Sequence, residues 1–149
     1  MANHLNEYID SEFDKSIKLL NAMSADAALR ELLARVVTLS VEALKRGNKL
    51  LFAGNGGSAA DAQHWAGELV SRFNFDRPGL AAIALTTDTS ILTAIGNDYG
   101  YDYVFARQVE ALGRSGDLLF AISTSGNSKN IVRAIKAARD AGIGVIGFT

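Results

Sequence analysis

Apolar side chains recur at intervals of three and four positions through residues 1–46, which is the spacing of one face of an α-helix. A first helix is predicted from the stripe Leu5, Ile9, Phe13, Ile17 and Leu20. A second is predicted from Leu29, Leu32, Leu33, Val36, Val37 and Leu44. We expect Ser24 to cap the second helix and Gly47 to end it. The two helices carry surplus apolar surface, which can pack against a partner subunit or against the sheet itself.

From residue 47 onward, short apolar segments alternate with helical ones. Strands are predicted at 49–53, 80–85, 117–122 and 143–148, and helices at 58–73, 90–95, 104–112 and 130–141. The strand segments are apolar throughout rather than alternating, which is typical of parallel strands buried on both faces. We therefore predict an α/β fold with three αβα layers, a parallel sheet between helices. Ligands of such folds bind beyond the carboxyl ends of the strands.

The composition limits the classes of function. The chain has 149 residues, 48% of them hydrophobic, and a net charge of −1. That length suits one domain, and a charge near zero gives no long-range attraction for nucleic acid or an anionic membrane. Cysteine is absent, which excludes disulfides and thiolate metal sites and fits a cytoplasmic protein. The sequence ends on a predicted strand, and parallel strands normally lead into further cover, so we expect the functional protein to continue beyond Thr149.

The loop Gly54–Ser58, with the sequence Gly-Asn-Gly-Gly-Ser, follows a predicted strand and opens a helix. Its glycines allow the backbone to approach a ligand, and the N-terminus of the helix offers N–H groups to an anion. One alternative is a plain tight turn. A second is a dinucleotide site, because Gly54 to Ala59 satisfies G-x-G-x-x-A. That fingerprint also requires an acid at the end of the next strand, and Asp88 comes a little late for it.

A second loop, Ser123–Ser128, lies between the third predicted strand and the next helix. It contains four hydroxyl side chains, from Ser123, Thr124, Ser125 and Ser128. Hydroxyls and helix N–H groups together form a neutral phosphate cradle. The alternative is that one serine caps the helix and the others fill the loop, but a cap needs only one side chain. We predict that the second loop binds phosphate and the first a polyol, so the ligand is a phosphorylated sugar.

His64 and Glu68 are four residues apart on one predicted helix and therefore share a face. A histidine and a carboxylate at this spacing can bind one divalent metal ion, and Glu68 can alternatively act as a general base on a sugar carbon. The spacing alone favours a third interpretation, a surface ladder of His64, Glu68 and Arg72. Asn97 and Asp98 can hydrogen-bond to sugar hydroxyls, or they can be ordinary turn residues.

Taken together, these motifs resemble the sugar isomerase (SIS) domain family and, within it, the bacterial phosphoheptose isomerases. The matching stretches are 54–58, 61–64, 68–72, 77–79, 94–98 and 122–128. The resemblance implies a single SIS domain over 1–149, with a helical pair for oligomerisation at 1–46 and the sheet core at 47–149. It implies a cytoplasmic homotetramer that converts D-sedoheptulose 7-phosphate to D-glycero-D-manno-heptose 7-phosphate through an enediol, in the biosynthesis of heptose and lipopolysaccharide precursors.

The resemblance also implies roles for individual residues. The implied substrate contacts are Asn55, Gly56, Gly57, Glu68, Asn97, Asp98, Ser123, Thr124, Ser125 and Ser128. One zinc ion per subunit is implied, with His64 and Glu68 among its ligands and Glu68 also the catalytic base. The family's other ligands, a glutamine and a histidine that serves as the acid, lie on a C-terminal helix that nothing here matches. We therefore expect them beyond residue 149, and expect the 149-residue chain alone to be inactive.

Two other functions fit the same fold. A non-catalytic SIS protein that binds the bacterial replication initiator resembles this chain, but it lacks a carboxylate at the position of Glu68 and a glycine of the first loop. This chain has both Gly57 and Glu68. Because isomerisation needs a base and protein binding does not, Glu68 favours the enzyme. A regulatory domain that senses sugar phosphates usually comes with a DNA-binding module, of which this sequence shows no sign.

Overall fold

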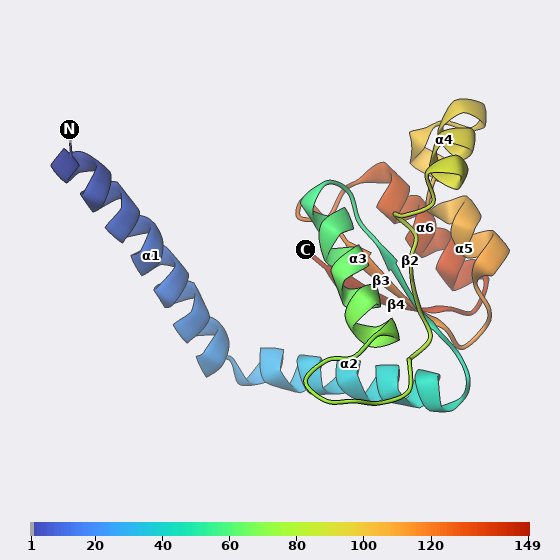
Figure 1. The fold of residues 1–149 in the computed structure, drawn as a ribbon, viewed down its shortest axis with the longest axis horizontal. Helices are drawn as coiled ribbons and strands as arrows, with labels where there is room; N and C mark the ends of the chain where they lie inside the picture. Colours follow the sequence, from blue (N-terminus) through green and yellow to red (C-terminus); the bar gives the residue numbers. More distant parts are fainter. Residues whose placement is uncertain (1) are drawn as a thin grey trace. The chain divides into compact units, whose positions relative to one another are not determined.

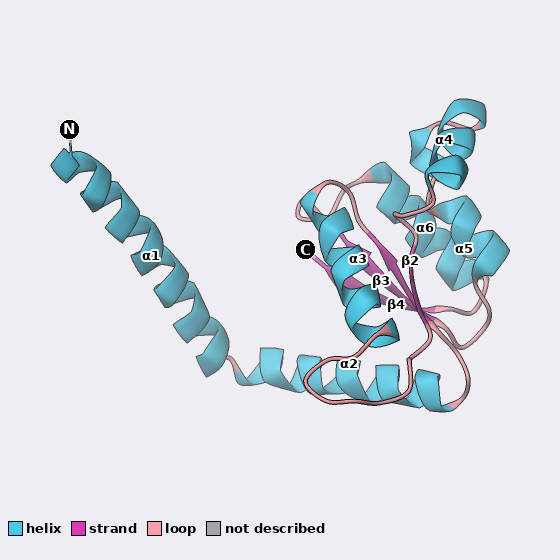
Figure 2. Ribbon diagram, viewed as in Figure 1, coloured by secondary structure: helices cyan, strands magenta, loops and turns pink. Residues whose placement is uncertain are grey.

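The computed structural model describes residues 2–149, with side chains from residue 4 onward. The chain divides into two compact units, one ending at Thr38 and the other spanning Leu39–Thr149. The helices are α1 (Ala2–Ala25), α2 (Ala27–Lys45), α3 (Gly57–Val70), α4 (Thr89–Asp98), the 3-10 turn η1 (Tyr101–Tyr103), α5 (Ala106–Leu112) and α6 (Lys129–Asp140). The strands are β1 (Leu50–Ala53), β2 (Ala82–Ala84), β3 (Leu118–Ile122) and β4 (Gly144–Phe148). Figures 1 and 2 show them, and each predicted element is present with bounds shifted by a few residues.

A parallel four-stranded sheet with the order β2-β1-β3-β4 forms the centre of the second unit. The register aligns Leu50 of β1 with Ala82 of β2 and with Leu118 of β3, which in turn aligns with Gly144 of β4. Because the strands run in one direction, the loops after β1 and β3 leave the sheet at the same edge, which we call the carboxyl edge. The predicted α/β class is confirmed.

Helices cover both faces of the sheet, with α3 on one face and α5 and α6 on the other (Figure 1). On the α3 face, Trp65 lies with its ring centroid 6.0 Å from Phe52 and 5.1 Å from Phe148. The opposite face contributes to a buried cluster made of Leu51, Ala53, Leu85, Val104, Phe105, Val109, Leu119, Ala121, Ile131, Ala134, Ala138 and Ile143. Neighbouring residues of β1 point to opposite faces, and apolar cover on both sides explains why the strand is apolar throughout.

The two central strands and the two edge strands differ in burial. Every residue of β1 and β3 is buried, as predicted for strands covered on both faces. In contrast, Ile83 of β2 is 37% exposed, and β4 has no fully buried residue. The prediction that all the strands are buried on both faces is therefore wrong for β2 and β4. A strand at the edge of a sheet has a neighbour on one side only, so its side chains are less completely covered.

In the first unit, the predicted cap of the second helix is wrong. Ser24 lies inside α1, and Asp26 stands between the two helices. The carboxylate of Asp26 accepts a hydrogen bond of 3.0 Å from the N–H of Leu29, so it satisfies a donor in the first turn of α2.

The predicted apolar stripe of α1 is exposed, at 41–65% for Leu5, Ile9, Phe13, Ile17 and Leu20. Across residues 2–149, no helix has the length and hydrophobicity needed to cross a membrane.

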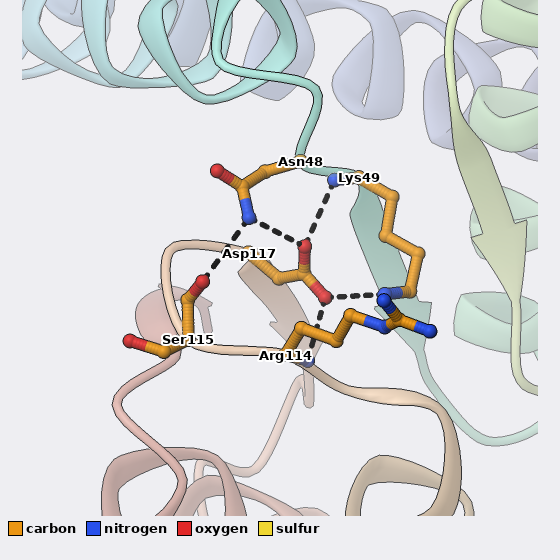
Figure 3. Close-up of polar contacts among 5 residues, drawn as sticks. All are labelled: Asn48, Lys49, Arg114, Ser115 and Asp117. Carbon is orange, nitrogen blue, oxygen red and sulfur yellow. Dashed lines mark hydrogen bonds and ion pairs between the residues drawn. The ribbon is translucent and has the colours of Figure 1, made fainter.

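A buried carboxylate joins β1 and β3 at the opposite edge of the sheet, the amino edge (Figure 3). Asp117 is 1% exposed and accepts hydrogen bonds from the main-chain N–H of Lys49 at 3.0 Å and of Arg114 at 2.9 Å. The ammonium group of Lys49 lies 2.5 Å from Asp117 Oδ2, and the side-chain amide of Asn48 donates to Asp117 Oδ1 at 3.2 Å. Burial raises the pKa of Asp117, but these hydrogen bonds outweigh that effect and hold the pKa below its ordinary value of 3.8.

Candidate active site

The three glycines of the first loop have different structural roles. A Cβ atom at Gly54 would overlap the main-chain carbonyl of Ser58, so the first turn of α3 packs directly on this glycine. Gly56 has a φ of 57°, in the left-handed region that glycine adopts at little cost. A Cβ atom at Gly57 would meet nothing within 4 Å. The fold therefore requires Gly54 and Gly56, whereas Gly57 leaves open space at the start of α3.

The second loop brings three of its four hydroxyls together. Ser123 is 6% exposed, and its hydroxyl donates to Ser128 Oγ at 3.0 Å and lies 3.5 Å from Ser125 Oγ. Gly126, with a φ of 66°, turns the chain, and its N–H donates to the carbonyl of Ser123 at 2.9 Å. Thr124 and Ser125 are exposed. The loop is thus a tight turn whose hydroxyls gather at the start of α6.

The N-cap residues of the two helices that follow these loops make no side-chain hydrogen bond to the first turn, although within α6 the side chain of Asn130 accepts from the N–H of Ile131 at 2.9 Å. Gly56 is the N-cap residue of α3 and has no side chain to offer, and Ser128, the N-cap of α6, makes no capping hydrogen bond. In α4, by contrast, the carboxylate of Asp88 accepts from the N–H of Ile91 at 2.9 Å. The alternative in which one serine of the second loop serves as the helix cap is therefore not supported at Ser128, the N-cap position. An uncapped helix N-terminus can instead donate its N–H groups to an anion.

A pair of side-chain amides connects the first loop to α6. Asn55 Nδ2 donates to Asn130 Oδ1 at 2.9 Å, and Asn130 Nδ2 donates to Asn55 Oδ1 at 2.8 Å. The hydroxyl of Tyr101, in η1, lies 3.4 Å from Asn55 Oδ1. The structure thus joins the predicted ligand residue Asn55 to two residues that no motif identified.

The residues Asn97 and Asp98 are the last two of α4, so they are helical rather than part of the predicted turn. Their side chains are exposed, and Asn97 donates to Asp98 at 2.8 Å. Tyr101, which follows them, is the residue of this region that reaches the first loop. Their predicted contact with a sugar stays a prediction.

His64 and Glu68 lie together on α3, with 3.8 Å between His64 Nε2 and Glu68 Oε1. Their side chains are 71% and 36% exposed, so both are open to a ligand. Arg72 lies beyond Val70, where α3 ends, so the predicted helical ladder does not extend to it. At a rise of roughly 1.5 Å per residue, Glu68 lies about 16 Å along the helix from Gly57. The structure therefore pairs Glu68 with His64 and places Glu68 well along α3 from the first loop of its own chain.

Comparison with known proteins identifies the family. The model of the SIS domain matches residues 13–149. The phosphoheptose isomerase of Aneurinibacillus thermoaerophilus is 57% identical over 145 residues, covering 97% of this chain and 73% of the relative. That of Burkholderia pseudomallei is 54% identical and covers 100% of this chain and 76% of the relative. This chain belongs to the phosphoheptose isomerase family of SIS domain proteins. It spans about three quarters of the length of these relatives.

A solved structure supports the same assignment at the level of the fold. The phosphoheptose isomerase of Francisella tularensis superposes with a TM-score of 0.90 at 41% identity, covering 95% of this chain and 73% of that one. The three-layer fold and the two N-terminal helices predicted from the sequence are therefore those of phosphoheptose isomerases, which are aldose–ketose isomerases.

The pair formed by His64 and Glu68 fits part of a zinc site. In a tetrahedral site, donor atoms about 2 Å from zinc are roughly 3.4 Å apart, close to the 3.8 Å between these side chains. Both are exposed, and an imidazole and a carboxylate are ordinary zinc ligands. In residues 2–149, however, no group of three or more histidine, cysteine, aspartate or glutamate side chains could hold a metal ion. A zinc ion bound by this pair would therefore need its remaining one or two ligands from elsewhere.

Sequence reasoning did not anticipate the contacts that Arg77, Tyr101 and Asn130 make with the predicted site residues. Arg77 donates to the main-chain carbonyls of Glu68 and Leu69, both at 2.8 Å, and so caps the end of α3 next to Glu68. The matching stretch at 77–79 pointed to this position without giving its role. For Tyr101 and Asn130 there was no sequence signal, because their contacts join segments far apart in the chain.

Proposed function

We propose that the protein interconverts D-sedoheptulose 7-phosphate and D-glycero-D-manno-heptose 7-phosphate. The observation that carries the proposal is the match to phosphoheptose isomerases over 97–100% of the chain, and this chain contains Glu68 and both loops. The chemistry of the loops agrees with such a ligand: uncapped helix N-termini and grouped hydroxyls suit a phosphate, and the amide of Asn55 suits a sugar oxygen.

The phosphate has a natural place at the start of α6. The hydroxyls of Ser123, Ser125 and Ser128 gather there, and the N-terminus of the helix adds N–H groups and a partial positive charge. The net charge of −1 gives the chain no overall attraction for an anion, so the proposal relies on this local geometry. The body of the sugar then extends toward Asn55 and the open space at Gly57.

Glu68 acts as the base in this proposal. Its carboxylate removes a proton from the carbon beside the carbonyl, and the carbonyl oxygen gains a proton, which gives an enediol. The hydroxyl of the first carbon then loses its proton and becomes the new carbonyl, while a proton returns to the neighbouring carbon, so that no proton is gained or lost overall. The hydrogen bonds from Arg77 to the carbonyls of Glu68 and Leu69 hold the turn of α3 that carries this base. His64 and Glu68 would provide two of the ligands of a zinc ion, and a bound zinc ion would stabilise negative charge on the substrate oxygens.

Turnover of sedoheptulose 7-phosphate by the full-length protein tests the activity, with Glu68→Gln as the deciding variant. Glutamine keeps the size of the side chain but cannot accept the proton, so kcat should fall about a thousandfold. The control is Glu110→Gln on α5, which removes an exposed carboxylate outside the site and should leave kcat unchanged. A Glu68→Gln protein with the wild-type kcat would show that Glu68 is not the base. Metal analysis of the wild type and of His64→Ala tests the zinc ligand independently of activity.

A cytoplasmic homotetramer belongs to the same proposal. The exposed apolar stripe of α1 supports it, because a surface of this kind is stabilised when a second copy covers it. Within one chain, Glu68 lies about 16 Å along α3 from the first loop. A tetramer would allow Glu68 of one copy to lie near the loops of another copy, so that both could contact the same substrate molecule. Light scattering measures the assembly directly: a tetramer is expected for the wild type, and Phe13→Asp should dissociate it. A wild-type protein that remains monomeric at high concentration would contradict this part.

A further inference from the structure

Asn130 is a buried amide with no role assigned by any motif of the chain. It lies in the first turn of α6 and is 4% exposed, although it directly follows the exposed Lys129. Its side chain makes three hydrogen bonds, two with the amide of Asn55 and one from the main-chain N–H of Ile131 at 2.9 Å. A polar side chain this deeply buried has a fixed environment, so the direction of each hydrogen bond can be worked out.

The N–H of Ile131 determines which way the amide of Asn130 faces. A main-chain N–H can only donate, so the atom of Asn130 that it contacts must be the oxygen, Oδ1. The nitrogen of Asn130 then faces Asn55, and it requires an acceptor there, which is Asn55 Oδ1. The amide of Asn55 is thereby oriented as well, with its nitrogen donating back to Asn130 Oδ1. One main-chain N–H of α6 thus fixes the orientation of a side chain in the first loop.

This orientation limits what Asn55 can offer to a ligand. Its oxygen accepts from Asn130 at 2.8 Å and lies 3.4 Å from the hydroxyl of Tyr101. Its nitrogen carries two hydrogens, of which one points to Asn130. The remaining hydrogen is the one strong hydrogen-bonding group that the side chain of Asn55 has left. Asn55 therefore presents a donor, and it suits a carbonyl or hydroxyl oxygen of a sugar rather than a group that must itself donate.

We propose that Asn130 is a positioning residue that holds the amide of Asn55 as a hydrogen-bond donor toward the sugar body of the substrate. The proposal rests on the proposed function for the identity of that substrate. It assigns to Asn130 an effect that acts entirely through Asn55. The reciprocal amide pair also joins the loop after β1 to the helix after β3, so binding of phosphate at α6 and of the sugar at Asn55 share one rigid connection.

A double-mutant cycle tests this route. In the wild-type background, Asn130→Ala should lower kcat/KM for sedoheptulose 7-phosphate about tenfold, because Asn55 is then free to turn its oxygen toward the substrate. In the Asn55→Ala background the same change should lower kcat/KM less than about twofold, because nothing is left to orient. An equal fold-change in both backgrounds would overturn the proposal.

Two further variants separate orientation from stability. Asn130→Asp keeps the acceptor for Ile131 but removes the donor to Asn55, so it should also lower kcat/KM about tenfold or more. Gln108→Ala is the matched control, because Gln108 is another buried amide, 5% exposed, which donates to the carbonyls of Leu85 and Val104 away from the loops. It should lower the melting temperature without changing kcat/KM. If Gln108→Ala lowered kcat/KM as much as Asn130→Ala does, Asn130 would have only a structural role.

A spectroscopic measurement does not depend on the substrate. In nitrogen-15 NMR spectra of the full-length protein without ligand, the side-chain amide signals of Asn55, assigned by their loss in Asn55→Ala, should be well dispersed and should exchange slowly with water. Asn130→Ala should return them to the positions and the fast exchange of a free amide. If the wild type fails to turn over sedoheptulose 7-phosphate, the proposed function is wrong, and this spectrum alone decides the role of Asn130. Unchanged Asn55 signals in Asn130→Ala would contradict the positioning role.

Discussion

The amino and carboxyl edges of the sheet differ in whether their polar groups are hydrogen-bonded within the protein. At the amino edge, the carboxylate of Asp117 is buried, and donors of the protein itself satisfy it, from Asn48, Lys49 and Arg114 (Figure 3). At the carboxyl edge, the N-cap residues of α3 and α6 make no side-chain capping hydrogen bond, and serine hydroxyls gather where α6 begins. Both edges join β1 to β3. At the amino edge the polar groups are paired with one another within the protein, whereas at the carboxyl edge they are arranged to bind a ligand.

This difference teaches how to separate stability from function in the same fold. Hydrogen bonds that are made within the protein contribute to the free energy of unfolding, whereas groups that wait for a ligand contribute to binding. A substitution at the amino edge should therefore reduce stability and spare ligand affinity. A substitution at Gly57 or Ser128 should do the reverse. The following experiments test that contrast, in order of decreasing expected effect.

Asp117→Asn should have the largest effect on stability, about 3 kcal/mol, because it places an amide nitrogen against the ammonium group of Lys49 in a buried site. Urea denaturation followed by circular dichroism measures it. The matched control is Asp140→Asn, which breaks the ion pair with Lys136: its 2.6 Å separation is similar, but the side chains are 76% and 65% exposed. This control should cost about 0.3 kcal/mol. Equal losses in the two variants would show that burial is not what makes the amino edge stable.

Sequence patterns predicted the carboxyl edge much better than the amino edge. The glycines and serines of the loops are near neighbours along the chain, so spacing alone indicates a ligand site after β1 and β3. Asp117 and its partner Lys49 are far apart in the sequence, and only the parallel register of β1 with β3 brings them together. The same reason hid Asn130, which meets Asn55 across the fold. A site made of residues that are close together in the sequence can be predicted from their motif. A pair of residues that only the topology of the fold brings together cannot.

Errors within single elements have similarly local causes. Ser24 was expected to cap the second helix, but Asp26 does so, because both residue types cap well and periodicity does not place the break between two adjoining helices. The burial of β2 was overestimated because an apolar run does not reveal whether a strand is central or at the edge. The family, by contrast, followed from several motifs together, none of which is specific alone.

The glycines of the first loop provide the next test. Gly54→Ala should cost about 2 kcal/mol of stability, because the new Cβ overlaps the carbonyl of Ser58 and forces α3 away from β1. Gly57→Ala should instead stabilise the protein by about 0.5 kcal/mol, because its Cβ meets no atom and alanine favours the helix. Calorimetric titration with sedoheptulose 7-phosphate should nevertheless show weaker binding by Gly57→Ala, about tenfold. A Gly57→Ala protein that binds normally would show that the open space is not used.

Acid should weaken the amino edge selectively. The folded-state pKa of Asp117 lies below its unfolded value, so its contribution to stability is fully present above about pH 4 and is lost as the pH falls through the folded pKa. Asp117→Asn has no such titration. The stability difference between wild type and Asp117→Asn, measured by urea denaturation between pH 6 and pH 2.5 at roughly constant ionic strength, should therefore shrink as the pH falls below about 4. A difference that stays constant over this range would contradict the lowered pKa.

The smallest changes in stability are expected at two helix N-termini of the carboxyl edge, those of α4 and α6. Asp88→Ala removes the acceptor for the N–H of Ile91 and should cost about 1 kcal/mol, whereas Asp88→Asn should cost less because asparagine also caps. Ser128→Ala should cost about 0.5 kcal/mol or less, because its hydroxyl is no cap and only loses the hydrogen bond from Ser123. The order should be reversed for ligand binding. Affinity for sedoheptulose 7-phosphate should fall about tenfold in Ser128→Ala and should be unchanged in Asp88→Ala. If Ser128→Ala proved the less stable variant and bound normally, Ser128 would be a structural residue and the contrast between the edges would not extend to α6.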